Sequence, residues 1–127
     1  PEAKRSLAAA AGGLIKLPRQ IPPRIAMELA LTGDFIDAKR AYELGFVNRI
    51  VDGPALEGAK TLARAVAENG PLALIASKKV IRESHTWSDA EMWQKQAAIV
   101  MPVFASEDAR EGAAAFAEKR KPNWQGK

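Results

Sequence analysis

The sequence contains no cysteine, few aromatic residues and no long apolar run. Without cysteine, the chain has no disulfide, no thiolate nucleophile and no cysteine-ligated zinc, which fits a reducing compartment such as the cytoplasm. Aromatic residues make up only 6% of the chain, so few side chains could stack on single-stranded nucleic acid. No apolar run approaches the roughly 20 residues of a membrane-spanning helix. We therefore expect no membrane span.

The composition that remains is that of a globular protein, with 47% hydrophobic and 27% charged residues in 127 residues. A chain of this length is enough for one domain with its own core. Its net charge of +4 favours an anionic partner, whether nucleic acid, lipid head groups or a phosphorylated cofactor. No helix-turn-helix, RNA-recognition or zinc pattern supports nucleic acid, so we expect no nucleic-acid partner.

Glycines, prolines and the spacing of apolar residues predict a mostly α-helical chain with a short β segment. The predicted helices are a short one before Pro18, then 24–31, 38–44, 56–68, 72–83, one from 89 to about Pro102, and one from about 107 to about 120. The single predicted strand is the β-branched run 46–51, which the turn residues Asp52-Gly53-Pro54 close. The chain starts at Pro1, followed by charged and alanine residues, and we expect it to be part of a longer polypeptide.

Helix caps follow from the same pattern. Asp34 or Asp37 offers an N-cap for the helix 38–44, and Gly33 ends the helix before it. Ser88 with Glu91 three residues later predicts a capping box. The single His85 has no second metal ligand or triad partner nearby, so we expect no metal site.

Five motifs follow one another along the chain. They are Pro1-Glu2, Gly12-Gly13 before a Leu-x-x-Leu segment, Ala26-x-Glu28-x-x-Leu31-Thr32-Gly33-Asp34, Ala38-x-x-Ala41-x-x-x-Gly45-x-Val47-Asn48, and a tail from Ser106-Glu107-Asp108 to Glu118-Lys119-Arg120. Taken together and in this order, they resemble the enoyl-CoA hydratase/isomerase (crotonase) family. The resemblance implies the C-terminal portion of a crotonase-type α/β spiral fold plus a helical oligomerisation tail. Residues 1–53 would end the core, and residues 54–127 would form the helical region. Ser6 and the run Ala9-Ala10-Ala11 depart from the family pattern, which often has glycine or proline there.

The resemblance also implies a reaction. Family members move protons at the α-carbon of acyl-CoA thioesters and hydrate enoyl double bonds in fatty-acid metabolism; other relatives are isomerases, hydrolases or dehalogenases. Glu2 would be the catalytic carboxyl. The second glutamate and the oxyanion hole would come from the N-terminal part of the same enzyme, so we expect the isolated chain to be inactive. The substrate carries its own coenzyme A, so no further cofactor is expected.

For the CoA nucleotide, the resemblance implies contacts from Lys78, Phe116 and Lys119, in a homo-oligomer that is a trimer or hexamer. Other interpretations stay open. Glu2 and Lys78 would otherwise be solvated surface charges, Phe116 a core residue and Lys119 a cation at a helix end. The alternative function is a non-catalytic helical interaction module. We expect Trp87, Trp93 and Trp124 to be packing or interface anchors.

Overall fold

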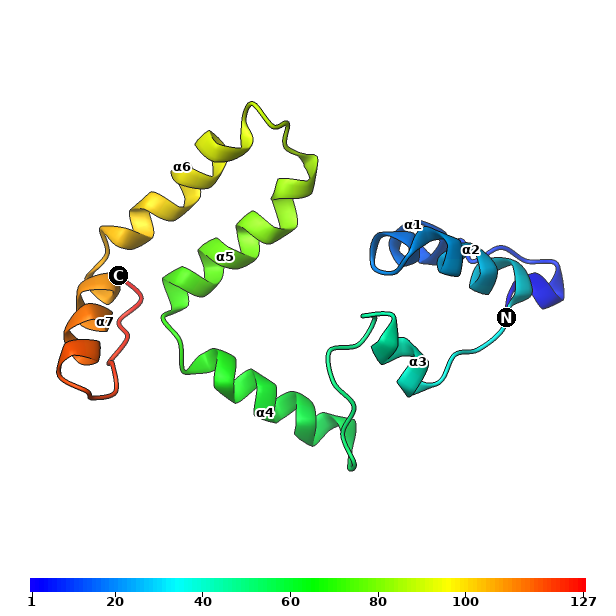
Figure 1. The fold of residues 1–127 in the computed structure, drawn as a ribbon, viewed down its shortest axis with the longest axis horizontal. Helices are drawn as coiled ribbons and strands as arrows, with labels where there is room; N and C mark the ends of the chain where they lie inside the picture. The colour runs from blue at the N-terminus through cyan, green and yellow to red at the C-terminus, as the bar shows by residue number, and fades with distance from the viewer. The chain divides into compact units, whose positions relative to one another are not determined.

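The computed structural model describes all 127 residues, which form helices joined by short connections with no β-strand (Figure 1). The chain divides into two compact units, Pro1–Gly58 and Ala59–Lys127, and each is described by itself. The division falls inside helix α4 (Ala55–Ala67), and the boundary between core and helical region that we expected after residue 53 stays a prediction. None of the helices is both long and apolar enough to cross a membrane.

The first unit contains two 3-10 helices and three short α-helices. In chain order these are η1 (Ala3–Arg5), α1 (Gly13–Lys16), η2 (Leu17–Arg19), α2 (Pro23–Thr32) and α3 (Ala38–Glu43). The predicted signals set the helix ends. Gly33 closes α2 in the left-handed conformation, at φ 67°. The Asp37 carboxylate caps α3 by accepting a bond of 2.7 Å from the Arg40 amide, which selects Asp37 over Asp34 as the cap.

The predicted strand at 46–51 is wrong. The amides of Phe46 and Val47 turn back and donate to the Ala41 carbonyl, at 2.9 and 3.4 Å, which finishes the end of α3. The Val51 side chain packs against Gly58 in α4, where a Cβ would lie 2.7 Å from Val51 Cγ1. A strand requires a neighbouring strand to satisfy its amides and carbonyls, and the rest of this chain is helix and loop. The β-branched composition of this segment was therefore not enough by itself to form a strand.

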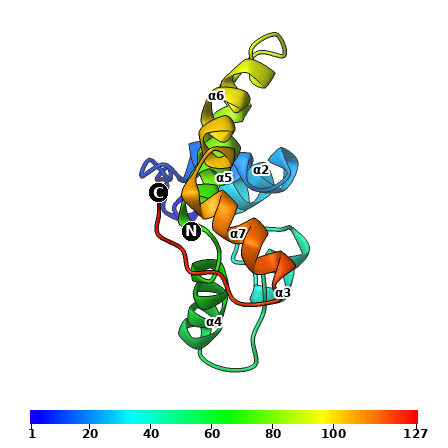
Figure 2. The same cartoon turned by 90° about the vertical axis from the view of Figure 1, so that its left-hand side faces the viewer.

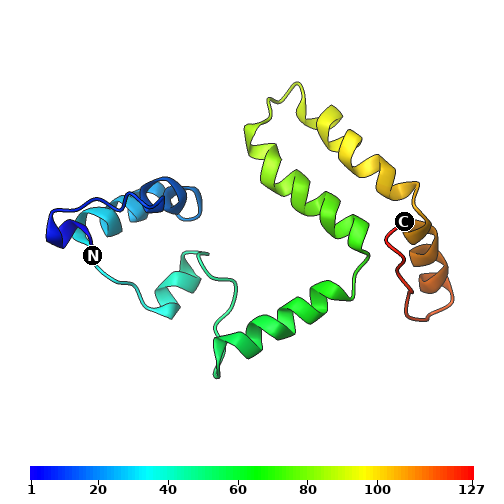
Figure 3. The same ribbon diagram turned by 180° about the vertical axis from the view of Figure 1, so that it is seen from behind.

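The second unit contains the longer helices. Helix α4 (Ala55–Ala67) leads into it, and α5 (Pro71–Glu83), η3 (Ser84–Thr86), α6 (Met92–Phe104) and α7 (Glu107–Ala117) follow. Helices α5 and α6 pack side by side as a hairpin (Figures 1 and 3). Pro102 lies within α6, two residues before its end, so the helix continues only briefly past the residue that cannot donate a backbone bond. The predicted restart at Ser106 is confirmed, because its hydroxyl accepts a bond of 3.0 Å from the Ala109 amide.

The capping box at Ser88 is not formed as predicted. Helix α6 starts only at Met92, and the Ser88 hydroxyl donates to the Glu91 carboxylate at 2.7 Å instead of accepting from a backbone amide. Residues 89–91 form a turn. The two side chains that define the motif therefore bond each other, and the helix begins one turn later.

Beyond α7 the last ten residues return along that helix (Figure 2). The Trp124 indole donates to the Glu68 carbonyl at 2.9 Å, and its ring lies against Gly70 and Gly112. Trp124 is thus the packing anchor that we expected. Trp93, in contrast, is exposed on α6.

Few apolar side chains are covered within the chain. The buried ones are Ile21, Ala26, Ala41, Ala76 and Ala115, and no large side chain is fully buried. Many large apolar residues are exposed, among them Phe35, Ile81, Phe104 and Phe116. Exposed apolar surface of this extent is typical of faces that contact other protein or a ligand.

Candidate active site

Glu2 lies immediately before η1, at the start of the first unit. The segment after it is a tight turn, in which the Glu2 carbonyl accepts bonds from the amides of Arg5 at 2.9 Å and Leu7 at 3.0 Å. The Glu2 carboxylate lies 3.0 Å from the terminal nitrogen of Pro1 and is half exposed.

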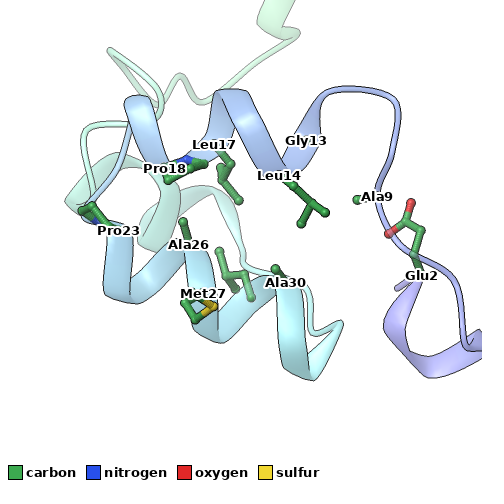
Figure 4. Close-up of a pocket in the computed structure, with 11 residues that line it drawn as sticks. Glu2, Ala9, Gly13, Leu14, Leu17, Pro18, Pro23, Ala26, Met27 and Ala30 are labelled. Atoms are coloured by element: carbon green, nitrogen blue, oxygen red, sulfur yellow. The ribbon is translucent and has the colours of Figure 1, made fainter.

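The Glu2 side chain lies at one end of an apolar hollow of about 380 Å³ (Figure 4). Apolar side chains of α1, η2 and α2 face one another across it. They are Leu14, Leu17, Pro18, Pro23, Ala26, Met27, Leu29 and Ala30, with Ala9 and Gly13 at the rim beside Glu2. Glu2 is the only ionisable residue among those that line the hollow. A single carboxyl beside an apolar hollow suits proton transfer on a largely apolar substrate.

Phe116 and Lys119 are brought together at the end of α7. The helix ends at Ala117, so Lys119 does not continue it as the sequence predicted. Instead Lys119 adopts the left-handed conformation at φ 54°, its amide donates to the Phe116 carbonyl at 3.3 Å, and the Arg120 amide donates to the Ala115 carbonyl at 3.0 Å. These two bonds define a Schellman motif. The prediction failed because such motifs usually carry glycine, which is absent here.

Phe116 is 88% exposed, which excludes the interpretation of Phe116 as a core residue of this chain. A salt-bridge network holds the turn beside it. Both Arg120 terminal nitrogens donate to the Glu111 carboxylate, at 2.6 and 2.9 Å, and the Asn123 amide donates to the same group at 2.7 Å. These bonds lower the pKa of Glu111 to about 2. The turn that carries Lys119 is therefore fixed on both sides.

Lys78 is exposed on α5, within the second unit. Its position fits either a solvated face or a contact with a phosphate. Glu2 belongs to the first unit, whereas Lys78, Phe116 and Lys119 belong to the second. Nowhere in the chain do three or more His, Cys, Asp or Glu side chains gather as a metal site would require.

The sequence analysis missed the contacts around the Glu2 turn. Lys4 forms an ion pair of 2.6 Å with Asp34, which is 30 positions away in the chain. Gly33 is buried against Pro1 and Lys4. The glycine was expected only as a helix end, and no spacing rule connects residues so far apart.

The first unit thus places a single carboxyl beside an apolar hollow. Comparison with known proteins shows to which family the chain belongs. The profile of the family described as enoyl-CoA hydratase/isomerase matches residues 1–127. This chain belongs to the enoyl-CoA hydratase/isomerase family.

Individual relatives agree with that assignment. Enoyl-CoA hydratase EchA19 of Mycobacterium tuberculosis is 46% identical over 125 residues, covering 98% of this chain and 47% of the relative. Carnitinyl-CoA dehydratase of Proteus mirabilis is 37% identical over 132 residues, covering 100% of this chain and 51% of the relative. A crystal structure of an enoyl-CoA hydratase from M. tuberculosis H37Rv superimposes with a TM-score of 0.95 at 54% identity, covering 100% of this chain and 51% of the other. The chain spans about half the length of these relatives.

Proposed function

We propose that this chain forms the C-terminal part of an enzyme that hydrates the double bond of enoyl-CoA thioesters, with Glu2 as the residue that transfers the α-proton. The observation that carries the proposal is the single Glu2 carboxyl at the end of the apolar hollow, in a chain of this family. The hollow suits an acyl chain, because its lining offers no competing charge.

In hydration, the oxygen of water bonds to the β-carbon of the enoyl group and a proton is added to the α-carbon. In the reverse reaction the α-proton leaves and water is eliminated. A carboxyl such as Glu2 gives or takes that α-proton, while the negative charge that develops on the thioester oxygen needs hydrogen-bond donors. We propose that these donors, and a second glutamate that orients the water, come from the N-terminal half that the relatives possess. The names of the two relatives, a hydratase and a dehydratase, describe opposite directions of this chemistry.

We propose that Lys78, Phe116 and Lys119 bind the nucleotide end of coenzyme A. Phe116 offers an exposed ring on which adenine can stack, and the Lys119 backbone is bonded to that of Phe116 in one turn. An ammonium on a flexible stem pairs with phosphate as a point charge, which suits Lys119 and Lys78. The substrate brings coenzyme A with it, so the reaction needs no other cofactor.

The exposed apolar residues of α5 and α6 support a homo-oligomer, and we propose a trimer or a hexamer. We also propose that the enzyme acts in fatty-acid metabolism in the cytoplasm.

The test is the replacement Glu2→Gln in the complete enzyme, meaning this chain together with the half that the relatives carry before it. We expect kcat on a short enoyl-CoA to fall by at least ~10²-fold, the usual contribution of a general acid or base. The matched control is Glu28→Gln, since Glu28 is an exposed glutamate on α2 that does not line the hollow. Substrates should include enoyl-CoA, carnitinyl-CoA and a β,γ-unsaturated acyl-CoA, which separate hydration, dehydration and isomerisation. A Glu2→Gln enzyme that keeps most of its kcat on all three would remove Glu2 from the mechanism.

A further inference from the structure

The segment that carries Glu2 rests on the C-terminal end of α2 (Figure 1). Gly33 ends α2 at φ 67° and is buried. A Cβ built on Gly33 would lie 3.3 Å from the Pro1 Cα and 3.2 Å from the Lys4 Cγ. The residues on both sides of Glu2 therefore lie so close to Gly33 that an added Cβ would force them to shift by a few tenths of an ångström.

A second contact lies one residue further along the chain. The Asp34 carboxylate accepts a bond of 2.6 Å from the Lys4 ammonium, and the hydrogen bond and charge of Lys4 lower the pKa of Asp34. The Asp34 amide donates to the Thr32 hydroxyl at 3.2 Å, which ties the same residue to the last turn of α2. We call Gly33 and Asp34 together the α2 seat.

The turn after Glu2 is closed independently of the α2 seat. The Leu7 amide bonds the Glu2 carbonyl at 3.0 Å, the Ser6 amide bonds the Ala3 carbonyl at 3.2 Å, and Ser6 has φ 54°. This is a second Schellman motif, and it fixes the shape of the turn but not its place relative to the hollow. Its place is set by the contacts of Pro1 and Lys4 with the α2 seat, and α2 itself lines the hollow.

We propose that Gly33 and Asp34 are positioning residues for Glu2, which hold its turn on the helix that lines the hollow. The inference rests on the proposed role of Glu2. Proton transfer requires the carboxyl within hydrogen-bond reach of the α-carbon's proton, and a displacement of about 1 Å can cost ~10²-fold in rate. Neither Gly33 nor Asp34 lines the hollow, so a displaced turn should lower kcat more than it alters KM.

The chain provides a matched pair of glycines for the test. Gly33 and Gly45 both have positive φ, 67° and 72°, so alanine is strained to a similar degree at either position. At Gly45, however, a Cβ meets no atom within 4 Å, whereas at Gly33 it meets Pro1 and Lys4. Comparing Gly33→Ala with Gly45→Ala in the complete enzyme therefore separates displacement of the Glu2 turn from backbone strain.

We expect Gly33→Ala to lower kcat by about 10-fold, because its neighbours need to shift by only a few tenths of an ångström, and to leave KM within about twofold. Gly45→Ala should lose similar thermal stability and keep its kcat. If both variants keep kcat while Glu2→Gln abolishes it, the α2 seat does not position Glu2 and the proposed function stands. If Glu2→Gln itself keeps kcat, the proposed function is wrong.

A second set of variants leaves the backbone untouched. Lys4 and Asp34 are exposed, so Lys4→Met and Asp34→Asn should fold even if Gly33→Ala does not. If their ion pair holds the turn, each single variant and the double variant should lower kcat by the same factor, about threefold, since either change removes the one interaction. Arg40→Gln, which removes another exposed ion pair of the same unit, is the control. Unchanged kcat in all of them, or two independent losses that multiply in the double variant, would contradict a positioning role for the pair.

Discussion

The removal of the Asp108 carboxylate should release the C-terminal segment from α7. Asp108 is buried at the N-terminal end of this helix, and its two oxygens accept bonds from the backbone amides of Gln125 at 2.7 Å and Gly126 at 2.9 Å. A third bond, from the Asp108 amide to the Lys127 carbonyl at 3.1 Å, uses only backbone atoms and survives substitution. Asp108→Ala therefore removes two side-chain bonds to the carboxylate and leaves one bond between backbone atoms.

Hydrogen bonds to charged groups contribute about 1.5–3 kcal/mol each, but water can reach the freed amides and offset part of the loss. We take ~2 kcal/mol for the pair, which corresponds to an about 30-fold rise in the opening equilibrium of this segment. The assay is amide hydrogen exchange resolved by residue. Exchange at Gln125 and Gly126 should accelerate by that factor, whereas exchange at Ala76 in α5 should not change, because the opening is local.

The control is Glu107→Ala. It removes a negative charge from the same first turn of α7, and so it loses the same kind of interaction with the helix dipole. Glu107 differs from Asp108 in that it is exposed and has no bond to the C-terminal segment among those observed. We expect less than about a twofold change in this variant. Equal acceleration in both variants, or none in Asp108→Ala, would refute the claim that these two bonds hold the segment.

Three other predictions concern the ion pair of Glu111, the residues with positive φ, and the exposed apolar face of α6. First, the pKa of Glu111, lowered from 4.5 to about 2, means that its ion pair with Arg120 stabilises the fold above pH 4.5 and is lost as the pH falls towards 2. The protection of the Asn123 amide against exchange, taken relative to the intrinsic exchange rate at each pH, should therefore fall in that window, and in Glu111→Gln this protection should not change with pH there. Second, Ser6→Gly and Lys119→Gly should each raise the unfolding free energy by roughly 1 kcal/mol, because glycine relieves a left-handed conformation, but only Lys119→Gly should raise KM for acyl-CoA, with kcat unchanged. A pantetheine thioester without the nucleotide is the control substrate, and an equal KM rise with it would exclude a phosphate contact. Third, sedimentation of the complete enzyme should show a trimer or hexamer that Phe104→Asp weakens; a monomer at micromolar concentration would contradict the oligomer.

Some helix ends could be predicted from the sequence, because each of these depends on a local chemical signal. Gly33 and Asp37 act through their own backbone or side chain over a few residues, and the structure places both as expected. The 46–51 segment failed for the opposite reason. Its apolar, β-branched pattern describes what a strand would contain, but a strand exists only if another strand pairs with it, and pairing is not a local property.

The candidate site shows the same contrast between local signals, which the sequence reveals, and contacts between distant residues, which it does not. Glu2 and Phe116 were predicted as site residues because they belong to motifs in register with a family, and the structure adds that Glu2 adjoins a hollow and that Phe116 is exposed. The ion pair between Lys4 and Asp34 was not found, since it joins residues 30 positions apart and neither belongs to a spacing rule. Such a contact can be predicted only once the fold is known.

Both non-glycine residues with positive φ, Ser6 and Lys119, lie in Schellman motifs that also contain a proposed site residue. Around Ser6 the motif closes on the Glu2 carbonyl, and around Lys119 it closes on the Phe116 carbonyl. Glycine would be more stable at both positions, so the cost of roughly 1 kcal/mol needs a reason in each case. For Lys119 the proposed contact of its side chain with phosphate would supply a reason, because glycine would remove that side chain. For Ser6 no side-chain contact explains why a residue other than glycine is present, and the family pattern often has glycine there. The proposed ligand-binding role thus offers an explanation for the unfavourable backbone conformation at Lys119, and no such explanation is at hand for Ser6.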